Sequence, residues 1–588
     1  LFTFPLCLML YPIRRGTGGT RVPLIDWALL LTTLVAIGYW LIEYPSYAYR
    51  IGDPQSMDII MGAVVVLLSL EAARRVVGWV LPLLAVIGLL YAYLGPYVPG
   101  VLGHFGFGMQ RIVEYTAVGM GGIYGIVTNT YATFIFPFIV FASFLQAAGG
   151  GVAIEEISSA LAGSTRGGPA KVAVVSSGFI GSVTGSSAAN AVVTGSYTIP
   201  LMMKSCYKPQ TAAAIDAAAS TGGQFMPPIM GAAAFLIASF TETPYLEIIR
   251  LSAFPAFLYF LGVGMMVHFV AAREGLKGMP KELLPKLKET LIKRGYMLLP
   301  IIMILAVLIA GYSAQLAAVV AIIFTIGLSY IRKDTRMGPK KIVAALAQGA
   351  KNSLAVGATA GVIGIIMAIV TMTGLGIKFS SVVISMSGGF LPITVLLVAI
   401  AGYLLGMGVT ITATYILLSV LAVPALMELG VPLITAHLVA FWFCETGGVT
   451  PPVALVAFAA SSIAKCNPYK AGVEAVRLAS PLFVIPMLFI YTPILMDGPI
   501  PNVIETMVSC LVGMIAYAGM MQGYWIKRVN WLERVLLGVA AFCLFVPNIY
   551  SDLGGLILLV VLSLFNHRKT DEVPSAAGQD MVAHRETL

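Results

Sequence analysis

The sequence predicts an all-α polytopic membrane protein, because of its apolar composition, the length of its apolar blocks and the placement of its charges. Hydrophobic residues make up 59% of the 588 positions and charged residues 10%, whereas roughly a quarter of a soluble chain is charged. The apolar residues gather in blocks that approach the about 20 residues a helix needs to cross a bilayer. Residues 27–44, 77–94 and 251–270 are among the clearest, and weaker blocks bring the total to roughly 15 to 17 hydrophobic segments.

The positive charges lie in loops between these segments. The formal net charge of +9 includes a basic loop at residues 273–296 and a second at residues 332–341. An excess of Lys and Arg in short loops is typical of the cytoplasmic side of a membrane protein, so the charge gives no reason to expect nucleic acid as a partner. Two apolar segments joined by an uncharged turn at residues 311–315 separate the basic loops, which places both loops on one side. Residues 285–292 fit either a short amphipathic helix in the headgroup layer or a solvated linker.

Both ends of the chain place polar sequence next to apolar sequence. Residues 1–10 are apolar and are followed by Arg14 and Arg15, which predicts the cytoplasmic end of a helix whose first residues lie upstream. In a signal peptide the charges would precede the apolar core. Residues 566–588 are polar, and we expect a disordered tail there. The six cysteines are scattered without a CxxC pair, which is typical of packing residues rather than of a disulfide frame or a metal site.

Two stretches of the chain, residues 181–245 and 406–469, resemble each other at a spacing of 224 to 225 residues. The matched positions are Pro200 with Pro424, Thr211 with Thr435, Thr221-Gly222-Gly223 with Thr446-Gly447-Gly448, Pro227-Pro228 with Pro451-Pro452, and Pro244-Tyr245 with Pro468-Tyr469. Internal repeats in a membrane protein predict two halves that fold alike. In many such chains the halves are inverted and a binding site lies between them.

Each copy contains polar, glycine-rich sequence in strongly apolar surroundings. The first is residues 181–190, inside an uncharged run from 172 to 203, and the second is residues 406–414, inside an uncharged run of 49 residues from 379 to 427. A bilayer penalises unpaired backbone groups heavily, so this sequence predicts broken helices that line a cavity. Freed carbonyl oxygens there can bind a hard cation such as Na⁺, and half-helix N-termini can face a carboxylate. The alternative for any single residue is close helix packing through small side chains.

The Gly-Gly and Pro-Pro pairs predict a second discontinuity in each copy. Pro227-Pro228 and Pro451-Pro452 each remove two amide donors and interrupt a helix. We expect Gly222-Gly223 and Gly447-Gly448, just before them, to supply flexible backbone. Packing alone does not require both motifs in both copies. We therefore expect a cation to bind where the two discontinuities of a copy meet.

Few ionisable groups lie in the repeated segments. Asp216, Glu445 and His437 are the candidates, because charge inside a membrane segment marks function by default. Glu445 directly precedes Thr446-Gly447-Gly448, which suits either ion or proton coupling or a hydrogen-bonded structural carboxyl. The scarcity of charge favours a coupling ion bound by neutral oxygens, hence Na⁺ over a carboxylate proton relay.

Several motifs resemble a known family. Residues 167–175 (GGPAKVAVV), 194–202 (TGSYTIPLM) and 219–235 (ASTGGQFMPPIMGAAAF) are similar to the membrane component of tripartite ATP-independent periplasmic (TRAP) transporters. Residues 445–454 (ETGGVTPPVA) are similar to the same family, and residues 71–78 (EAARRVVG) look like its N-terminal region. The resemblance is to the TAXI type, in which the small and the large (DctM-like) membrane subunits are fused.

The resemblance implies a fold, a function and partners. Such permeases are elevator-type secondary transporters, in which a fixed scaffold holds a moving domain whose site lies between two re-entrant helical hairpins. They belong to the bacterial inner membrane and import a small organic anion delivered by a periplasmic substrate-binding protein of the TAXI type. Symport with Na⁺ is the usual coupling, H⁺ is the alternative, and no other cofactor is implied.

The resemblance also divides the chain and points to residues. It implies small-subunit-like scaffold helices at residues 1–110, a first transport repeat at 111–272, a basic cytoplasmic or interfacial linker at 273–295, a second scaffold and transport repeat at 296–477, further membrane helices at 478–565 and a polar tail at 566–588. The implied ion-binding residues are Ser186, Ser187, Asn190, Gly222, Pro227 and Pro228 in the first copy, with Thr410, Thr412, Thr414, Gly447, Thr450 and Pro451 in the second. The candidates for substrate binding or coupling are Thr184, Gly185, Thr221, Gly223, Glu445 and Thr446. The second copy has only threonines at the spacing of the Ser-Ser-Ala-Ala-Asn cluster, so the two expected ion sites need not be equal.

Two other functions compete with transport. The sequence has no HExxH, no GxSxG and no P-loop GxxxxGK[ST] motif, which argues against a hydrolase and against ATP-driven transport by this chain alone. A passive channel would favour a ring of subunits with a short filter motif over a long two-fold repeat. The repeated stretches contain no arginine to hold a carboxylate, so dicarboxylates, keto acids, amino acids and sulfonates all stay open as substrates.

Overall fold

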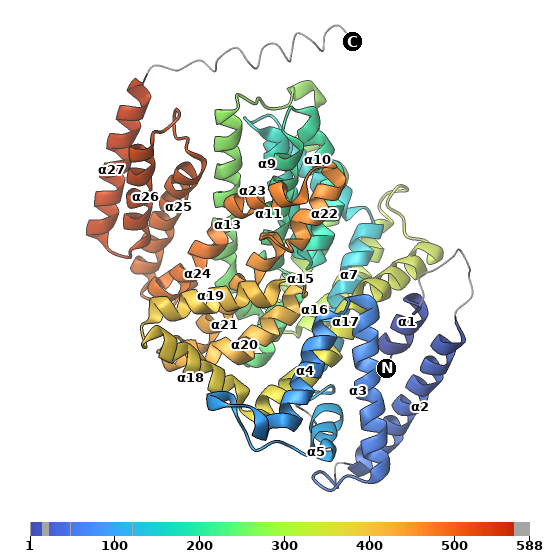
Figure 1. Ribbon diagram of the computed structural model, residues 1–588. Helices are drawn as coiled ribbons and strands as arrows, with labels where there is room; N and C mark the ends of the chain where they lie inside the picture. Colours follow the sequence, from blue (N-terminus) through green and yellow to red (C-terminus); the bar gives the residue numbers. More distant parts are fainter. Residues whose placement is uncertain (1, 14–22, 48, 120, 570–588) are drawn as a thin grey trace.

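The computed structural model describes residues 2–13, 23–47, 49–119 and 121–569, and these are mostly helical (Figure 1). Eleven of the described helices are long and apolar enough to cross a membrane, and five shorter helices are also apolar. The described residues form no β-strand beyond one isolated bridge between Tyr524 and Arg528. The prediction of an all-α polytopic membrane protein is confirmed. Arg14, Arg15 and most of the expected polar tail, 570–588, lie outside the described residues.

The first helices lie together at one flank of the molecule (Figure 1). They are α1 (Thr3–Leu10), α2 (Leu24–Tyr47), α3 (Ser56–Val76), α4 (Val80–Leu94) and α5 (Met109–Val113). Ion pairs join α2 and its following turn to both ends of α3: Arg75 to Asp26 at 2.7 Å, and Arg50 to Asp58 at 3.1 Å. Both aspartates are fully buried, and a buried charge in a membrane segment needs such a partner.

A first set of helices follows. It comprises α6 (Ile126–Thr130), α7 (Phe136–Ala147), α8 (Gly150–Ala162), α9 (Gly168–Thr184), α10 (Ser187–Lys204), α11 (Pro209–Gly222), α12 (Ala232–Phe240) and α13 (Tyr245–Arg273). Helices α9 and α10 pack against each other as a hairpin, and α11 packs against both. Pro227 and Pro228 lie in the irregular segment between α11 and α12, because neither proline can donate a helical hydrogen bond.

Three helices lead to a second set with the same order of elements. The connecting helices are α14 (Leu287–Arg294), α15 (Leu299–Ile309) and α16 (Ala314–Ser329). The second set comprises α17 (Pro339–Thr373), α18 (Leu375–Ser387), α19 (Leu391–Gly406), α20 (Ile411–Glu428), α21 (Leu433–Val449), α22 (Leu455–Ala464), α23 (Pro468–Leu478) and α24 (Pro481–Tyr491). Helices α19 and α20 form a hairpin against α21. Pro451 and Pro452 again separate a long helix from a short one.

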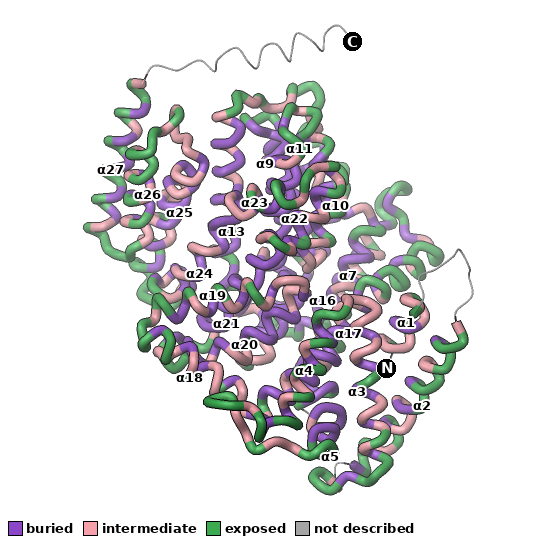
Figure 2. The backbone as a smooth tube through the Cα atoms, viewed as in Figure 1, coloured by how far each residue is buried: buried purple, intermediate pink, exposed green. Residues whose placement is uncertain are grey.

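The two sets interlock. Helix α22 of the second set packs against α10 and α11 of the first, while α12 of the first set packs against α20 and α21 of the second. A polar contact crosses the same interface, since the Thr211 hydroxyl donates to the Glu474 carboxylate at 3.0 and 3.1 Å. Burial is greatest in this central region, around α9, α11 and α21, whereas α2 and α27 (Ile549–Arg568) at the flanks are largely exposed (Figure 2).

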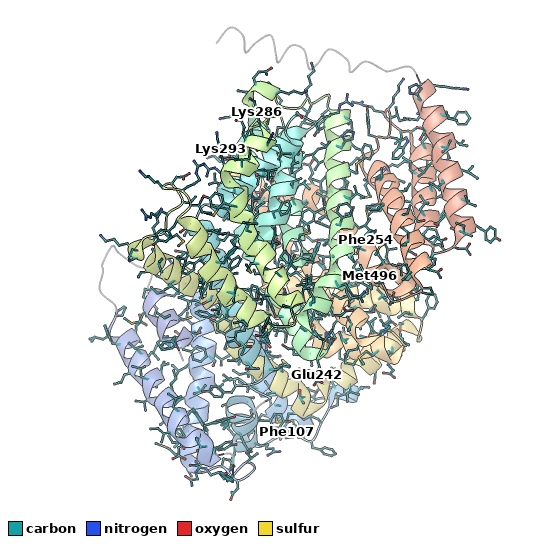
Figure 3. All side chains as sticks on the ribbon, turned by 180° about the vertical axis from the view of Figure 1, so that it is seen from behind. Phe107, Glu242, Phe254, Lys286, Lys293 and Met496 are labelled. Atoms are coloured by element: carbon teal, nitrogen blue, oxygen red, sulfur yellow. The ribbon has the colours of Figure 1, made fainter. Side chains whose placement is uncertain are left out.

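The two hairpins enter from opposite ends of the molecule. Helix α9 begins beside the first basic loop, where the Met279 amide donates to the Gly163 carbonyl at 2.9 Å. Helix α18, which leads into the other hairpin, contacts the loop between α4 and α5, and Lys378 donates to the Gly103 carbonyl at 2.7 Å. Lys286 and Lys293 of the first basic loop lie at one end, with Phe107 of the α4–α5 loop toward the other (Figure 3). We name these ends the basic-loop end and the opposite end.

Three C-terminal helices form a separate layer beside α13. They are α25 (Ile500–Gln522), α26 (Trp531–Phe545) and α27. Helix α25 packs along α13, and the three share an apolar cluster of their own. Ser509 donates to Asp552 at 2.6 Å, and the Trp525 indole donates to Ser563 at 2.8 Å. These contacts fasten α27 to the preceding segment.

Candidate functional site

The tip of the first hairpin is a tight turn between α9 and α10. Gly185 has a φ of +62°, a left-handed conformation that glycine adopts without a steric penalty. Ser186 then caps α10, accepting a hydrogen bond from the Ala189 amide at 3.4 Å. The free amides of the first turn of α10 begin at this point, since the first four N–H groups of a helix have no partner within it.

Asn190, in that first turn, ties the hairpin to α11. Its side chain is fully buried, and its amide nitrogen donates to the carbonyls of Ser177 at 3.0 Å and Ser220 at 3.4 Å. Its side-chain oxygen is also buried and has no hydrogen-bond partner among the described residues. A buried acceptor without a donor costs about 1–3 kcal/mol, so this oxygen is suited to a bound cation.

The second hairpin has a tip of the same kind. Gly408 has a φ of +79°, and Thr410 stands at the cap position of α20. Thr414 donates back to the Thr410 carbonyl at 3.2 Å. Within the described chain the Thr410 hydroxyl is buried without a hydrogen-bond partner. The second tip therefore also presents an unsatisfied oxygen, on a threonine rather than an asparagine.

The Gly-Gly pairs have a different role from the one expected. Gly222 and Gly223 keep helical φ angles of −58° and −60°, and Gly447 and Gly448 lie inside α21. Each pair instead permits close contact with the hairpin. A Cβ on Gly223 would lie 2.5 Å from the Gly181 Cα, and one on Gly447 would lie 2.9 Å from the Gly406 Cα. These positions need the absence of a side chain, while the flexibility expected of their backbone stays a prediction.

The irregular segments after α11 and α21 are held by nearby groups. The Gln224 amide donates to the Ser187 hydroxyl at 2.9 Å, which joins the first break to the first hairpin tip. Tyr245 donates to the Ile229 carbonyl. In the second set, Tyr403 donates to the Pro451 carbonyl at 2.5 Å and Thr450 donates to the Thr446 carbonyl at 2.6 Å. Both breaks are thus fixed in position beside a hairpin.

The two hairpin tips meet at one cavity of about 620 Å³. Its walls come from the first tip, the second tip, the segment after α11, and one face each of α7 and α17. The polar residues lining it are Ser143, Gln146, Thr184, Ser186, Gln224, Gln348, Asn352, Thr410 and Thr412. No charged side chain lines the cavity in the described part of the chain. An ion or anion there would meet hydroxyls, side-chain amides and backbone groups only.

The ionisable candidates lie outside this cavity. Glu445 is fully buried in α21, and neither of its carboxyl oxygens has a hydrogen-bond partner among the described residues. Asp216 is fully buried in α11, where one oxygen accepts from Thr194 at 3.3 Å and from Thr198 at 3.1 Å. His437 and the Tyr415 hydroxyl lie 2.8 Å apart. These groups are enclosed by packed helices, so their role differs from that of the cavity walls.

The structure brings some of the expected site residues together and separates others. Thr184, Gly185, Ser186, Thr410 and Thr412 line the cavity, and Ser187 contacts it through Gln224. The others stand behind its wall or farther away, among them Asn190, Thr414, Thr221, Gly222, Gly223, Thr446, Gly447, Thr450 and the prolines Pro227, Pro228 and Pro451. Glu445 packs near Tyr259 of the first set instead.

Four polar residues that line the cavity on α7 and α17 were not predicted from the sequence. These are Ser143 and Gln146 on α7 and Gln348 and Asn352 on α17. They lie outside the repeated stretches, which drew attention away from them. The sequence does contain one feature that points to them, the four-residue spacing of Gln348 and Asn352, because residues four apart lie on the same face of a helix. Gln224 was missed although it stands inside a family motif.

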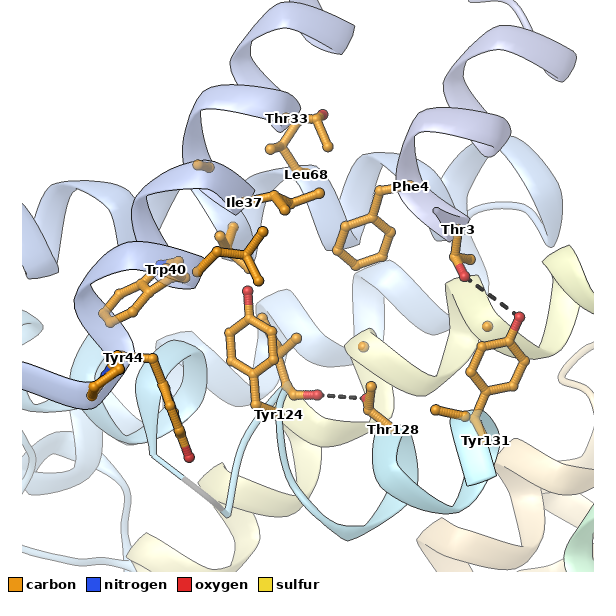
Figure 4. A pocket seen from close by; sticks show the side chains of 18 residues that line it. Thr3, Phe4, Thr33, Ile37, Trp40, Tyr44, Leu68, Tyr124, Thr128 and Tyr131 are labelled. Atoms are coloured by element: carbon orange, nitrogen blue, oxygen red, sulfur yellow. Dashed lines mark hydrogen bonds between the residues drawn. The ribbon is translucent and has the colours of Figure 1, made fainter. Parts of the chain in front are cut away.

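A second cavity, of about 490 Å³, lies between α1, α2, α3 and α17 and is lined mainly by apolar and aromatic side chains (Figure 4). Trp40, Phe4 and Tyr124 project into it, and Thr3 and Tyr131 lie 3.4 Å apart at its edge. Neither hairpin contributes to this cavity. It therefore lies apart from the site at the hairpin tips.

Several membrane-crossing helices surround one cavity at the hairpin tips, an arrangement that fits a membrane permease. Residues 64–495 match the family described as tripartite ATP-independent periplasmic transporter, DctM component. This is more than half of the chain, so the protein belongs to the DctM family of TRAP transporters, multi-pass proteins of the inner membrane that mediate secondary transport. Residues 503–553 match a domain of unknown function, DUF3394, which covers most of α25, all of α26 and the start of α27. Among curated proteins, none matches the chain.

Proposed function

We propose that this permease imports a small organic anion by symport with Na⁺, after delivery by a periplasmic binding protein of the TAXI type. The family supports the transport class, since TRAP transporters work with a periplasmic binding protein. The helices before residue 64 and the C-terminal layer support the fused form, in which small-subunit-like helices and the large subunit share one chain.

One observation carries the proposal: the N-terminal ends of α10 and α20 meet at a single cavity without charged walls. The positive end of a helix dipole and its free amides attract anions. Two such helix ends at one cavity favour the binding of a carboxylate, although no arginine of the described residues lines the cavity. The anion is then held by helix dipoles and hydrogen bonds rather than by an opposite charge, so its dissociation costs little free energy. Such binding suits a carrier that must release its substrate.

The coupling cation in this proposal binds beside the tips. A hard cation takes oxygen ligands, and the unpartnered oxygens of Asn190 and Thr410 are of that kind. In the first set we assign Ser186, Ser187 and Asn190 to it, with Gly222 and Gly223 providing carbonyls. In the second set the assigned residues are Thr410, Thr412, Thr414, Gly447 and Thr450. Thr221 and Thr446 directly precede Gly222 and Gly447 in the chain.

The order of elements and the opposite entry of the two hairpins favour an inverted repeat. We accordingly propose that the interlocked hairpins and breaks move as one body against the remaining helices, as in an elevator mechanism. The positive-inside bias then places the basic-loop end in the cytoplasm.

A second candidate is coupling to protons. It is favoured by Glu445, whose two oxygens are buried without a hydrogen-bond partner among the described residues, since an isolated carboxylate in such a place is very costly and the neutral acid is preferred. Asp216 is another buried carboxyl of the repeated segments, although two threonine hydroxyls already donate to it. A proton carried by Glu445 would enter and leave near the interface of the two sets.

The test is uptake of labelled organic acids into proteoliposomes under an imposed Na⁺ gradient, with and without the binding protein. Ser187→Ala and Thr450→Ala remove tip and break hydroxyls, and Ser196→Ala, an exposed position on α10, is the matched control. We expect accumulation of the acid to require both Na⁺ and the binding protein. It should be lost in the Ser187→Ala/Thr450→Ala double variant and retained in Ser196→Ala. Accumulation driven by a pH gradient alone would transfer the coupling role to Glu445. Mere equilibration under every gradient would refute coupled transport.

A further inference from the structure

The wall of the cavity opposite the hairpin tips carries a short chain of hydrogen-bonded side chains. The Gln348 amide donates to the Asn352 oxygen at 2.8 Å, the Asn352 amide donates to the Ser143 hydroxyl at 3.3 Å, and Ser143 donates to the Ile139 carbonyl at 3.1 Å. All three side chains line the cavity. We call Gln348, Asn352 and Ser143 the amide row.

The direction of these bonds decides what the amide row offers to a ligand. Asn352 uses its acceptor oxygen for Gln348, and each side-chain amide has two N–H groups of which one is engaged. Among the described residues the second N–H of Gln348 and that of Asn352 have no acceptor, so both are left for a ligand in the cavity, as is the Gln348 oxygen. Both residues are exposed, so these donors are accessible. Two N–H groups on one wall of the cavity suit an acceptor-rich ligand such as a carboxylate.

The amide row lies at the basic-loop end of the cavity. Ser143 and Gln146 belong to the last part of α7, and the chain continues from there into α8, which is paired with the first basic loop through Glu156 and Arg294 at 3.0 Å. Gln348 and Asn352 precede the apolar part of α17, and Lys351 between them is exposed. A solute leaving the tips toward the basic-loop end passes this row.

We propose that the amide row is the second half of the substrate site, which binds the organic anion through side-chain N–H groups as it passes from the hairpin tips to the basic-loop end. The anion is held between two helix N-termini on one wall and neutral amides on the other. Selection for negative charge is thus achieved without a charged side chain. This inference rests on the proposed function, since it assumes that the cavity carries the transported anion.

The test compares how fast an anionic and a cationic thiol reagent react with a cysteine placed in the amide row. Cys206, Cys466 and Cys543, the native cysteines that are not buried, are replaced by serine, and Gln348→Cys or Asn352→Cys is added. The reagents are the anionic sulfonatoethyl and the cationic trimethylammonioethyl methanethiosulfonates, and their rates are normalised to a free thiol. Ala347→Cys, exposed but outside the cavity, is the control. A salt concentration of about 1 M limits surface charge effects to about 3 Å.

We expect the ratio of the anionic to the cationic reaction rate to be about tenfold higher at Asn352→Cys than at Ala347→Cys. This difference is equivalent to about 1.4 kcal/mol. Adding Gln348→Glu to Asn352→Cys should abolish the preference, because a like charge nearby repels the reagent. Equal preference at both positions, or no reaction at either residue of the row, would overturn the inference. Labelling needs neither an ion gradient nor a binding protein, so an anion-selective row in a protein without coupled uptake would refute the proposed function alone.

Discussion

The two hairpin-and-break units, α9–α12 and α19–α22, share a frame but differ in the polar groups that they bear. Both have a glycine turn at the tip, a glycine contact between the hairpin and the next long helix, and a Pro-Pro segment held by a tyrosine. The first unit places Asn190 and Gln224 at its centre, where the second has Thr414 and the Gly448–Val449 step. Backbone geometry is thus common to the two units, whereas side-chain chemistry is specific to each.

The difference shows which features the geometry requires. A hairpin against a broken helix needs glycine wherever two backbones touch, and both units satisfy this need. Ligand binding makes no such symmetric demand, so Asn190 in one unit and Glu445 in the other can serve separate purposes. Each prediction below alters a pair of positions, one in each unit, that share either the same contact or the same place in the repeat.

The largest effect is expected where backbones touch. Gly223→Ala should lower the free energy of unfolding by about 3 kcal/mol and Gly447→Ala by about 1 kcal/mol, because the new Cβ comes within 2.5 Å of a backbone atom in the first case and 2.9 Å in the second. Thermal unfolding in detergent measures both. Equal losses would show that the two glycine contacts are equally tight, and Gly264→Ala, where a Cβ meets nothing within 4 Å, is the control.

A smaller effect is expected at the polar centre. Asn190→Leu should cost about 2 kcal/mol, because the carbonyls of Ser177 and Ser220 lose their donor, and it should raise the Na⁺ concentration needed for uptake at least about tenfold. Thr414→Val, at the matched position, removes a hydroxyl that donates to the Thr410 carbonyl at 3.2 Å and, more weakly, to the Leu405 carbonyl at 3.5 Å, and it should cost less than about 1 kcal/mol. Unfolding and the Na⁺ dependence of uptake are measured together. The assignment of Asn190 to the cation would fail if Asn190→Leu kept the Na⁺ dependence of the unaltered protein.

The smallest effect on stability is expected at Glu445→Gln and its counterpart Ser220→Ala. Neither Glu445 oxygen nor the Ser220 hydroxyl has a hydrogen-bond partner in the described structure, so each change should alter the free energy of unfolding by less than about 1 kcal/mol. Uptake separates the two variants, since only Glu445→Gln removes a titrating group. Retained pH-driven accumulation in Glu445→Gln would exclude this residue as a proton carrier.

The sequence was sufficient for the class of fold and for the motifs, and insufficient for the shape of the site. Apolar block length follows from bilayer thickness, so helix existence was predictable, and Pro227-Pro228 and Pro451-Pro452 interrupt helices for a purely local reason. The role of Gly223 was not predictable, because it depends on a contact with Gly181, 42 residues earlier in the chain. Gln348 and Asn352 are likewise placed opposite the tips by tertiary packing alone.

The interlocking of α22 with α10 and α11 has a consequence for the order of synthesis. The first unit emerges from the ribosome with one face uncovered, since α11 ends at Gly222 and its neighbour α22 begins at Leu455. At roughly 5–20 residues per second, the wait is roughly 10 to 50 seconds. During this time a helix rich in small residues must remain in the lipid without its final neighbour. A nascent chain arrested before residue 455 should therefore expose α11 to degradation, and the same chain arrested after residue 478 should be protected.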